Sequence, residues 1–160
     1  MRLERAAKRF FVQSGFTLLE LLAGCALFGI LTAIAVPSFT SFQPSFRLNG
    51  AARQAYGRLM WARAQAVDQN NQFIVSLANN HTLSILDDNN GNGSADVGET
   101  VTTVDIQLAY PDVTITRGLA DPNPTFLGRG TTLGTTNFTV SNAAGSRTIT
   151  VNITGVIKIN

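Results

Sequence analysis

The sequence predicts an α+β protein in which a long N-terminal helix packs on an antiparallel β-sheet domain. Three observations support this fold class. An apolar stretch covers residues 16–36, a helical apolar pattern continues to residue 71, and short apolar segments separated by turn residues fill residues 72–160. We therefore expect a leader peptide at 1–15, a transmembrane helix at 16–36, an amphipathic helix continuing it at 37–71, and a β domain at 72–160.

The apolar stretch FTLLELLAGCALFGILTAIAV contains one ionisable residue, Glu20. As a helix it spans about 31 Å, close to the thickness of a bilayer hydrocarbon core. A carboxylate in such a segment is costly to insert and marks a functional position by default. If the chain is cut between Gly15 and Phe16, the new α-amino group lies one turn from Glu20, or meets Glu20 of a neighbouring copy, and offsets its charge.

The residues ahead of this stretch favour such a cut. They form a basic segment that stays cytoplasmic under the positive-inside rule, so the rest of the chain lies outside. Its charged residues are Arg2, Glu4, Arg5, Lys8 and Arg9. The alternative is an ordinary signal peptide cut after Ala35, because Ala33-Ile34-Ala35 has the A-x-A pattern. Glu20 inside the apolar core argues against that alternative.

Composition argues against a nucleic-acid partner and against an enzyme. The formal net charge is +2, but from Phe16 onward eight basic residues stand against nine acidic ones. The single cysteine, Cys25, excludes an intrachain disulfide and lies in the apolar stretch. The only histidine, His81, is expected to be exposed beside a turn, and no nucleophile or metalloprotease motif occurs.

The segment after the apolar stretch predicts an amphipathic helix that ends between Asp68 and Asn71. Pro37 and Pro44 each lack a backbone donor, so we expect a kink or break there. An apolar seam with alternating spacings of four and three residues should pack on a sheet. It consists of Leu48, Ala52, Ala55, Leu59, Ala62 and Ala66. Four arginines scatter around this helix and indicate solvated charges: Arg47, Arg53, Arg58 and Arg63.

The remainder predicts strands separated by Gly, Asn, Asp and Pro clusters. The expected strands are Phe73–Ala78, Thr82–Leu86, Val101–Leu108, Val113–Arg117, Phe138–Ser141, Arg147–Ile153 and Val156–Ile159. Asn79-Asn80 is a plausible hairpin turn between the first two. Residues 121–136 show no period and predict an irregular loop.

The run from Gly15 through Glu20, the apolar stretch and Pro37 resemble the N-terminus of type IV pilins and type II secretion pseudopilins. The resemblance implies that a prepilin peptidase cuts between Gly15 and Phe16 and that the Phe16 nitrogen is methylated. It also implies that the helix serves first as a membrane anchor and later as filament core. Glu20 and Pro37 are then assembly positions.

The helix RLNGAARQAYGRLMWARAQAVDQNNQFIVSL and the ending Gly145–Gly155 resemble the H-type minor pseudopilins and T-type minor pilins. The resemblance implies a minor subunit of a type II secretion system or type IV pilus, in or at the tip of a periplasmic or surface filament. It implies a single-pass protein of the bacterial inner membrane with a periplasmic β domain. Its partners would be other pilins or pseudopilins bound through the helix, the peptidase and the inner-membrane assembly platform.

A DNA-binding minor pilin for DNA uptake is the alternative function. Some T-type members are proposed to bind DNA through a C-terminal Gly-Arg-x-Arg element. The matching place here reads Gly155-Val156-Ile157-Lys158, which argues against DNA binding.

One further pattern has the spacing of a calcium loop, D-x-[DN]-x-[DN]-G-x5-E, with Gly93 at the sharp turn. The candidate ligands are Asp88, Asn90, Asn92, Ser94 through its carbonyl, Asp96 and Glu99. Asn, Gly and Asp also dominate exposed turns, so a polar hairpin tip remains the alternative. A third function, an anchored calcium-dependent hydrolase, lacks a nucleophile and a base.

Overall fold

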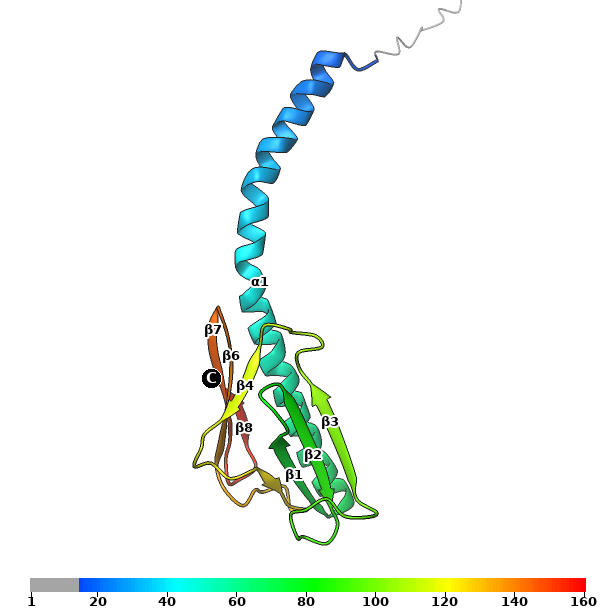
Figure 1. The fold of residues 1–160 in the computed structure, drawn as a ribbon, viewed down its shortest axis with the longest axis vertical. Coiled ribbons are helices and arrows are strands. Elements are labelled where there is room, and N and C mark those ends of the chain that lie inside the picture. Colours follow the sequence, from blue (N-terminus) through cyan, green and yellow to red (C-terminus); the bar gives the residue numbers. More distant parts are fainter. Residues whose placement is uncertain (1–14) are drawn as a thin grey trace, which may run out of the picture. The chain divides into compact units, whose positions relative to one another are not determined.

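The structure is a computed structural model that describes residues 15–160. The chain divides into two units between Thr40 and Ser41. Of the expected leader peptide, only Gly15 lies within the described residues. The single helix of residues 15–160, α1 (Leu18–Gln69), begins in the first unit and ends in the second (Figure 1).

Both ends of α1 have capping residues. At the N-terminus, the Glu20 backbone N–H donates to Thr17 Oγ1 (3.2 Å) and the Leu21 N–H donates to the Thr17 carbonyl (3.1 Å). Thr17 is therefore the N-cap. At the C-terminus, Asn70 adopts a left-handed φ of 51°, and the Asn71 N–H donates to the Ala66 carbonyl (3.0 Å). This left-handed residue ends the helix within the predicted range.

Neither proline breaks α1. A kink or break was expected at Pro37 and Pro44, and the break is wrong because the helix is continuous through both. Each proline removes one backbone hydrogen bond, and the bonds of the turns on either side remain. Thr40 also donates its hydroxyl to the Pro37 carbonyl (3.0 Å).

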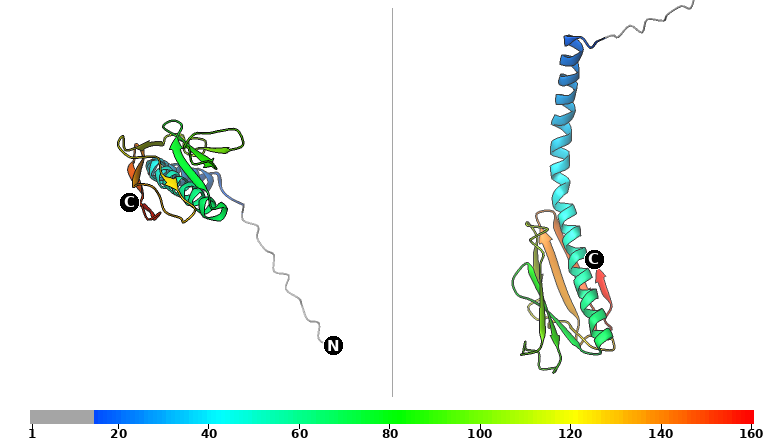
Figure 2. Two further views of the ribbon diagram at one scale, coloured as in Figure 1. Left: turned by 90° about the horizontal axis from the view of Figure 1, so that it is seen from below. Right: turned by 90° about the vertical axis from the view of Figure 1, so that its right-hand side faces the viewer.

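The second unit contains two four-stranded antiparallel sheets rather than one. The first has the order β3-β2-β1-β5 and the second β4-β6-β7-β8. Their bounds are β1 Gln72–Leu77, β2 Thr82–Asp88, β3 Thr100–Asp105, β4 Thr114–Arg117, β5 Thr125–Phe126, β6 Thr136–Asn142, β7 Gly145–Val151 and β8 Ile157–Ile159. In Figure 2 the strands of both sheets lie alongside the part of α1 that belongs to this unit.

Two departures from the predicted strands have local causes. β3 ends at Asp105 instead of Leu108, because Asp105 Oδ1 accepts the Gln107 N–H (2.8 Å) and turns the chain. The stretch expected to be an irregular loop, 121–136, contains β5, which pairs with β1 through Phe73 and Ile74. A two-residue strand has too few positions to show a period.

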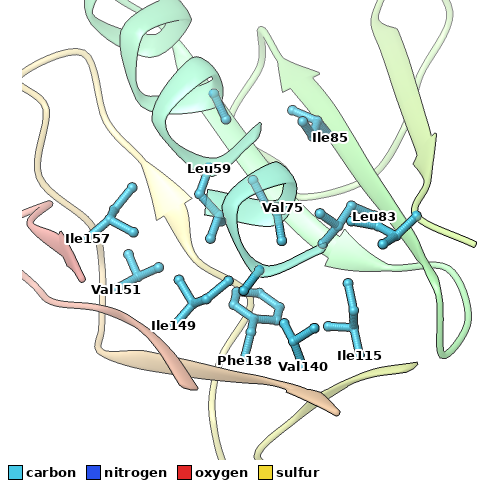
Figure 3. Close-up of a cluster of buried hydrophobic side chains, with 14 of the residues drawn as sticks. Leu59, Val75, Leu83, Ile85, Ile115, Phe138, Val140, Ile149, Val151 and Ile157 are labelled. Atoms are coloured by element: carbon cyan, nitrogen blue, oxygen red, sulfur yellow. The ribbon is translucent and has the colours of Figure 1, made fainter. Parts of the chain in front are cut away.

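The core lies between α1 and the two sheets. All six residues of the predicted seam are buried, from Leu48 at 4% exposed to Leu59, Ala62 and Ala66 at 0%. Figure 3 shows Leu59 among side chains from both sheets, including Val75 and Phe138. Burying one such large apolar side chain contributes about 1.5–3 kcal/mol, so this packing stabilises the second unit.

The β1–β2 turn forms as the sequence predicted. The Asn79 side-chain carbonyl accepts the backbone N–H groups of His81 (2.9 Å) and Thr82 (2.7 Å). The Ala78 N–H donates to the Thr82 carbonyl (2.9 Å) and closes the hairpin. The short side chain of Asn79 thus supplies the acceptor that the turn needs.

Candidate functional site

The N-terminal part of α1 presents an exposed apolar surface. Every residue from 15 to 40 is exposed, and the side chain of Phe16 is 84% exposed. The mean hydropathy of its most apolar 18-residue window is 2.2, and none of that window is buried. This helix is long and apolar enough to cross a membrane, and an apolar surface of this extent calls for lipid or another protein.

Glu20 lies in the first turn of α1, three residues after the N-cap Thr17. A carboxylate is favourable there because the helix macrodipole is positive at its N-terminus. Gly15 and Phe16 precede the helix in irregular, exposed chain, so the bond between them is accessible. The capping role of Thr17 was missed, although the spacing Thr17-x-x-Glu20 is that of a capping box.

An open groove of about 460 Å³ runs along the first turns of the helix. Its lining residues are Phe16, Glu20, Leu21, Gly24, Cys25 and Phe28. Gly24 and Cys25 are small, so space remains beside the larger rings of Phe16 and Phe28. The groove places Glu20 next to an apolar surface on which a neighbouring helix can pack.

The second candidate site is the polar loop, which we define as residues 88–99 between the end of β2 and the start of β3. Asp88 is 1% exposed. Its Oδ1 accepts the N–H groups of Gly91 (2.7 Å) and Asn92 (3.2 Å), and its Oδ2 accepts that of Gly93 (2.9 Å). Three backbone donors therefore wrap around one buried carboxylate, and Gly93 supplies the left-handed φ of +78° that the turn needs.

The side chains on the open side of the polar loop gather at Asp96. Its Oδ2 accepts the side-chain amides of Asn90 (2.9 Å) and Asn92 (2.5 Å). The hydrogen bond from Asn90, and then that from Asn92, lower the pKa of the Asp96 carboxyl below its usual value, against a smaller effect of desolvation. The two side-chain amides thus stabilise the ionised form of the Asp96 carboxyl.

Glu99 closes the polar loop through backbone groups. Its Oε1 accepts the Asn89 N–H (2.9 Å) and its Oε2 the Asp96 N–H (3.1 Å). Within residues 15–160, no three acidic, histidine or cysteine side chains form a metal-binding group. The six candidate oxygen ligands all lie in the polar loop. The carboxylates of Asp96 and Glu99 accept hydrogen bonds from N–H groups of the same loop.

His81 corrects the expectation of an exposed residue. It is half-buried, and its Nδ1 lies 2.9 Å from Asp105 Oδ1. The hydrogen bond with His81 is the main cause that lowers the pKa of the Asp105 carboxyl. The sequence held no signal for this pair, because its members are 24 residues apart.

Two of the four helix arginines have partners within the second unit, and both keep part of their surface in solvent. Arg47 lies 3.5 Å from the Asp112 carboxylate. Arg63 donates its Nε–H to the Gly130 carbonyl (2.9 Å). That carbonyl also packs against Gly155, the glycine that this sequence shares with the Gly-Arg-x-Arg element. Both arginines therefore contact groups of their own domain.

Comparisons with known proteins agree with this architecture. The crystal structure of the type IV minor pilin FimU of Pseudomonas aeruginosa superposes with a TM-score of 0.57 at 21% identity, over 74% of this chain and 92% of FimU. The minor pseudopilin EpsH from the type 2 secretion system of Vibrio cholerae superposes with a TM-score of 0.54 at 14% identity, over 71% of this chain and 96% of EpsH. At these identities the likeness shows the pilin-like fold.

Two family models match the sequence. The prokaryotic N-terminal methylation motif matches residues 11–36, and the type II transport protein GspH matches residues 51–155. No curated protein gives a significant match. Since the second match covers more than half of the chain, this protein belongs to the GspH family of type II secretion minor pseudopilins, which are structural subunits rather than enzymes, and it carries the methylation motif of their precursors.

Proposed function

We propose that a prepilin peptidase cuts this chain between Gly15 and Phe16, that the new Phe16 nitrogen is methylated, and that residues 16–36 anchor it in the bacterial inner membrane. The exposed apolar segment 16–40 carries this proposal, because its side chains need lipid before assembly and protein afterwards. The β domain, which has its own core, would then lie in the periplasm.

We further propose that the anchored subunit enters a periplasmic filament, in its shaft or at its tip, by packing this helix against the helices of other pseudopilins. The inner-membrane assembly platform would drive this step. The Glu20 carboxylate would pair with the Phe16 α-amino group of an adjacent subunit, across the groove that both residues line. In a low-dielectric setting a paired charge costs far less than an isolated one, so this contact would set the register of neighbouring subunits.

Replacing Glu20 tests the pairing. In the full-length chain expressed with its secretion machinery, Glu20→Gln keeps the shape of the side chain and removes its charge. We expect processing at Gly15 to continue and incorporation into the filament to fall roughly tenfold, which corresponds to about 1.4 kcal/mol. Leu19→Ala, which changes an exposed neighbour outside the groove without altering charge, is the matched control and should incorporate better than Glu20→Gln.

Two results would contradict this proposal. Incorporation of Glu20→Gln at the wild-type level would mean that the carboxylate does not set register. The second contradicting result would come from mass spectrometry of the mature protein. A chain that begins at Val36 or Ser38 would show cleavage at the end of the apolar stretch, whereas a chain that begins with methylated Phe16 would support the proposed cut.

We also propose that the polar loop binds calcium. Its ligands would be the side-chain oxygens of Asp88, Asn90, Asn92, Asp96 and Glu99 together with the Ser94 carbonyl, a set of the six or more oxygens that this hard cation takes. The buried Asp88 supports this, because its three backbone donors already fold the loop around the first ligand position. To reach an ion, Asp96 and Glu99 would exchange their N–H and amide partners for the metal.

Thermal unfolding of residues 41–160 with added calcium tests this site. Extracellular calcium modules have dissociation constants of about 0.1–1 mM. At 10 mM calcium, mass action then predicts about 1.4–2.7 kcal/mol of added stability, whereas magnesium at the same concentration should add less. Glu99→Gln, which removes one charge from the set, should lose most of the gain. An unchanged midpoint at millimolar calcium would favour the polar hairpin tip instead.

A further inference from the structure

We propose that the free edge of β3 takes up an extended strand from a neighbouring pilin-like subunit, and that this incoming strand carries a basic residue. β3 is an edge strand, because the first sheet has the order β3-β2-β1-β5. An open edge presents unpaired N–H and C=O groups, which form a template for another strand. Strand addition of this kind is a recurrent mode of recognition.

Of the four sheet edges within residues 15–160, the edge of β3 alone is long and unprotected. β5 has two residues, β8 has three and carries Lys158, and β4 has four and ends in Arg117. β3 has six residues, TVTTVD, without Lys, Arg or Pro. Short length, basic residues and proline are the usual devices that keep edges apart, so only β3 lacks them.

The hydrogen-bond register shows which groups on β3 face outward. The Ile106 N–H donates to the His81 carbonyl (2.9 Å), one step beyond the pairing of Asp105 with Thr82. Because bonded and non-bonded pairs alternate in an antiparallel ladder, the backbone groups of Val101 and Thr103 point away from β2. Val101 is 44% exposed and Thr103 is exposed as well, so neither side chain covers the edge.

A groove beside β3 can receive side chains of the incoming strand. It has a volume of about 250 Å³ and lies between α1 and β3, with Thr100 and Thr102 of β3 among its lining residues. Two aromatic side chains also line the groove. Trp61 of α1, which is partly exposed, contacts Phe73 edge-on with a distance of 6.3 Å between the ring centroids. An edge strand next to a groove offers main-chain bonds for affinity and a pocket for alternate side chains.

Charge indicates the kind of partner. The groove contains the Asp87 carboxylate and no basic residue, and Glu99 stands just before β3. Antiparallel pairing of β3 with β3 of a second copy would bring Glu99 opposite or diagonal to Asp105 of that copy, and like charges across strands are destabilising. A strand with Lys or Arg fits better. Edge strands with a basic residue occur in this fold, because β8 is an edge strand and contains Lys158.

Site-specific photo-crosslinking in cells tests the proposal on the full-length chain. Benzoylphenylalanine at Val101 should crosslink to another pilin-like subunit whose linked peptide is an extended segment with a basic residue. Thr103→Lys should lower this crosslink at least about tenfold, because a lysine repels the basic strand, whereas Thr103→Glu should preserve it. Thr116→Lys, on the exposed edge strand β4, is the matched control and should have no effect.

Three outcomes would overturn the proposal: no crosslink from Val101, a crosslink to a second copy of this chain, or equal effects of Thr103→Lys and Thr103→Glu. Thermal unfolding of each variant separates loss of binding from loss of folding. The proposal rests on the proposed function for the identity of its partner. The mature N-terminus and the incorporation into the filament are therefore measured on the same samples. If both are normal and the crosslink is absent, only the strand-addition proposal fails.

Discussion

Gly155 marks a close contact between two loops of the β domain. A Cβ at this position would lie 1.9 Å from the Gly130 carbonyl oxygen and 3.0 Å from Arg63 Nε, whereas real Cβ atoms stay at least 3.0 Å from such atoms. Gly155→Ala therefore forces the two loops apart by about 1 Å, since interiors are close-packed. The same oxygen accepts the Arg63 Nε–H at 2.9 Å, so this separation breaks that hydrogen bond.

The cost of Gly155→Ala has two parts. Gly155 has a left-handed φ of +78°, which costs about 1–2 kcal/mol for a residue with a Cβ. Losing a hydrogen bond from a charged donor costs about 1.5–3 kcal/mol. We therefore expect the variant to lose about 2.5–5 kcal/mol, which lowers the melting temperature of a domain of this size by roughly 8–25 °C.

Gly93→Ala is the matched control. Gly93 has the same φ of +78° but no heavy atom within 4 Å of its Cβ position. It should lose only the conformational part, about 1–2 kcal/mol. Urea and thermal unfolding of residues 41–160, in the presence of a chelator to remove any calcium effect, measure both variants. Equal losses for Gly155→Ala and Gly93→Ala would refute the contact argument.

Two further predictions concern pH and the helix. The pKa of Asp105 is lowered in the folded state, mainly by His81, so its contribution to stability is present above the unfolded value and is lost as the pH falls through the folded one. Urea unfolding from pH 6 to pH 2 should show a shallower acid decline for Asp105→Asn, and a slope identical to wild type would contradict this. Gly57→Ala should gain about 0.5–1 kcal/mol, because helix propensity rises and its Cβ meets nothing within 4 Å. Gly50→Ala should lack this gain, since its Cβ would lie 2.6 Å from the Tyr110 ring; equal melting temperatures for the two would argue against the contact.

The features that could be predicted from the sequence are those set by local repetition. The 4-3 spacing of Leu48 to Ala66 is a property of one helix, and its buried face followed directly. Asn79-Asn80 similarly predicted the β1–β2 turn, because an Asn side chain can accept hydrogen bonds from backbone N–H groups two and three residues later. Such signals need no knowledge of the rest of the fold.

The features that were missed depend on residues distant in sequence. β5 exists because Phe126 and Thr125 pair with β1 more than 50 positions away, and neither shows a strand pattern by itself. The His81–Asp105 pair likewise depends on the pairing of β2 with β3, and the Arg63–Gly130 bond on the packing of a loop against α1. Tertiary contacts decide such positions, and one sequence does not encode them as a local pattern.

The polar loop and the edge strand belong to one hairpin, which connects the two proposals for this domain. Asp88 closes β2 and is buried, while Glu99 immediately precedes the first residue of β3. An ion held by both residues would fix the distance between the strand ends and so restrict the motion of β3. A strand bound at β3 would restrict the same hairpin from its other side. By linkage, each event would then favour the other through the hairpin entropy that the first has already lost. Calcium on Glu99 would act in the opposite sense, because it neutralises part of the negative charge that attracts a basic strand.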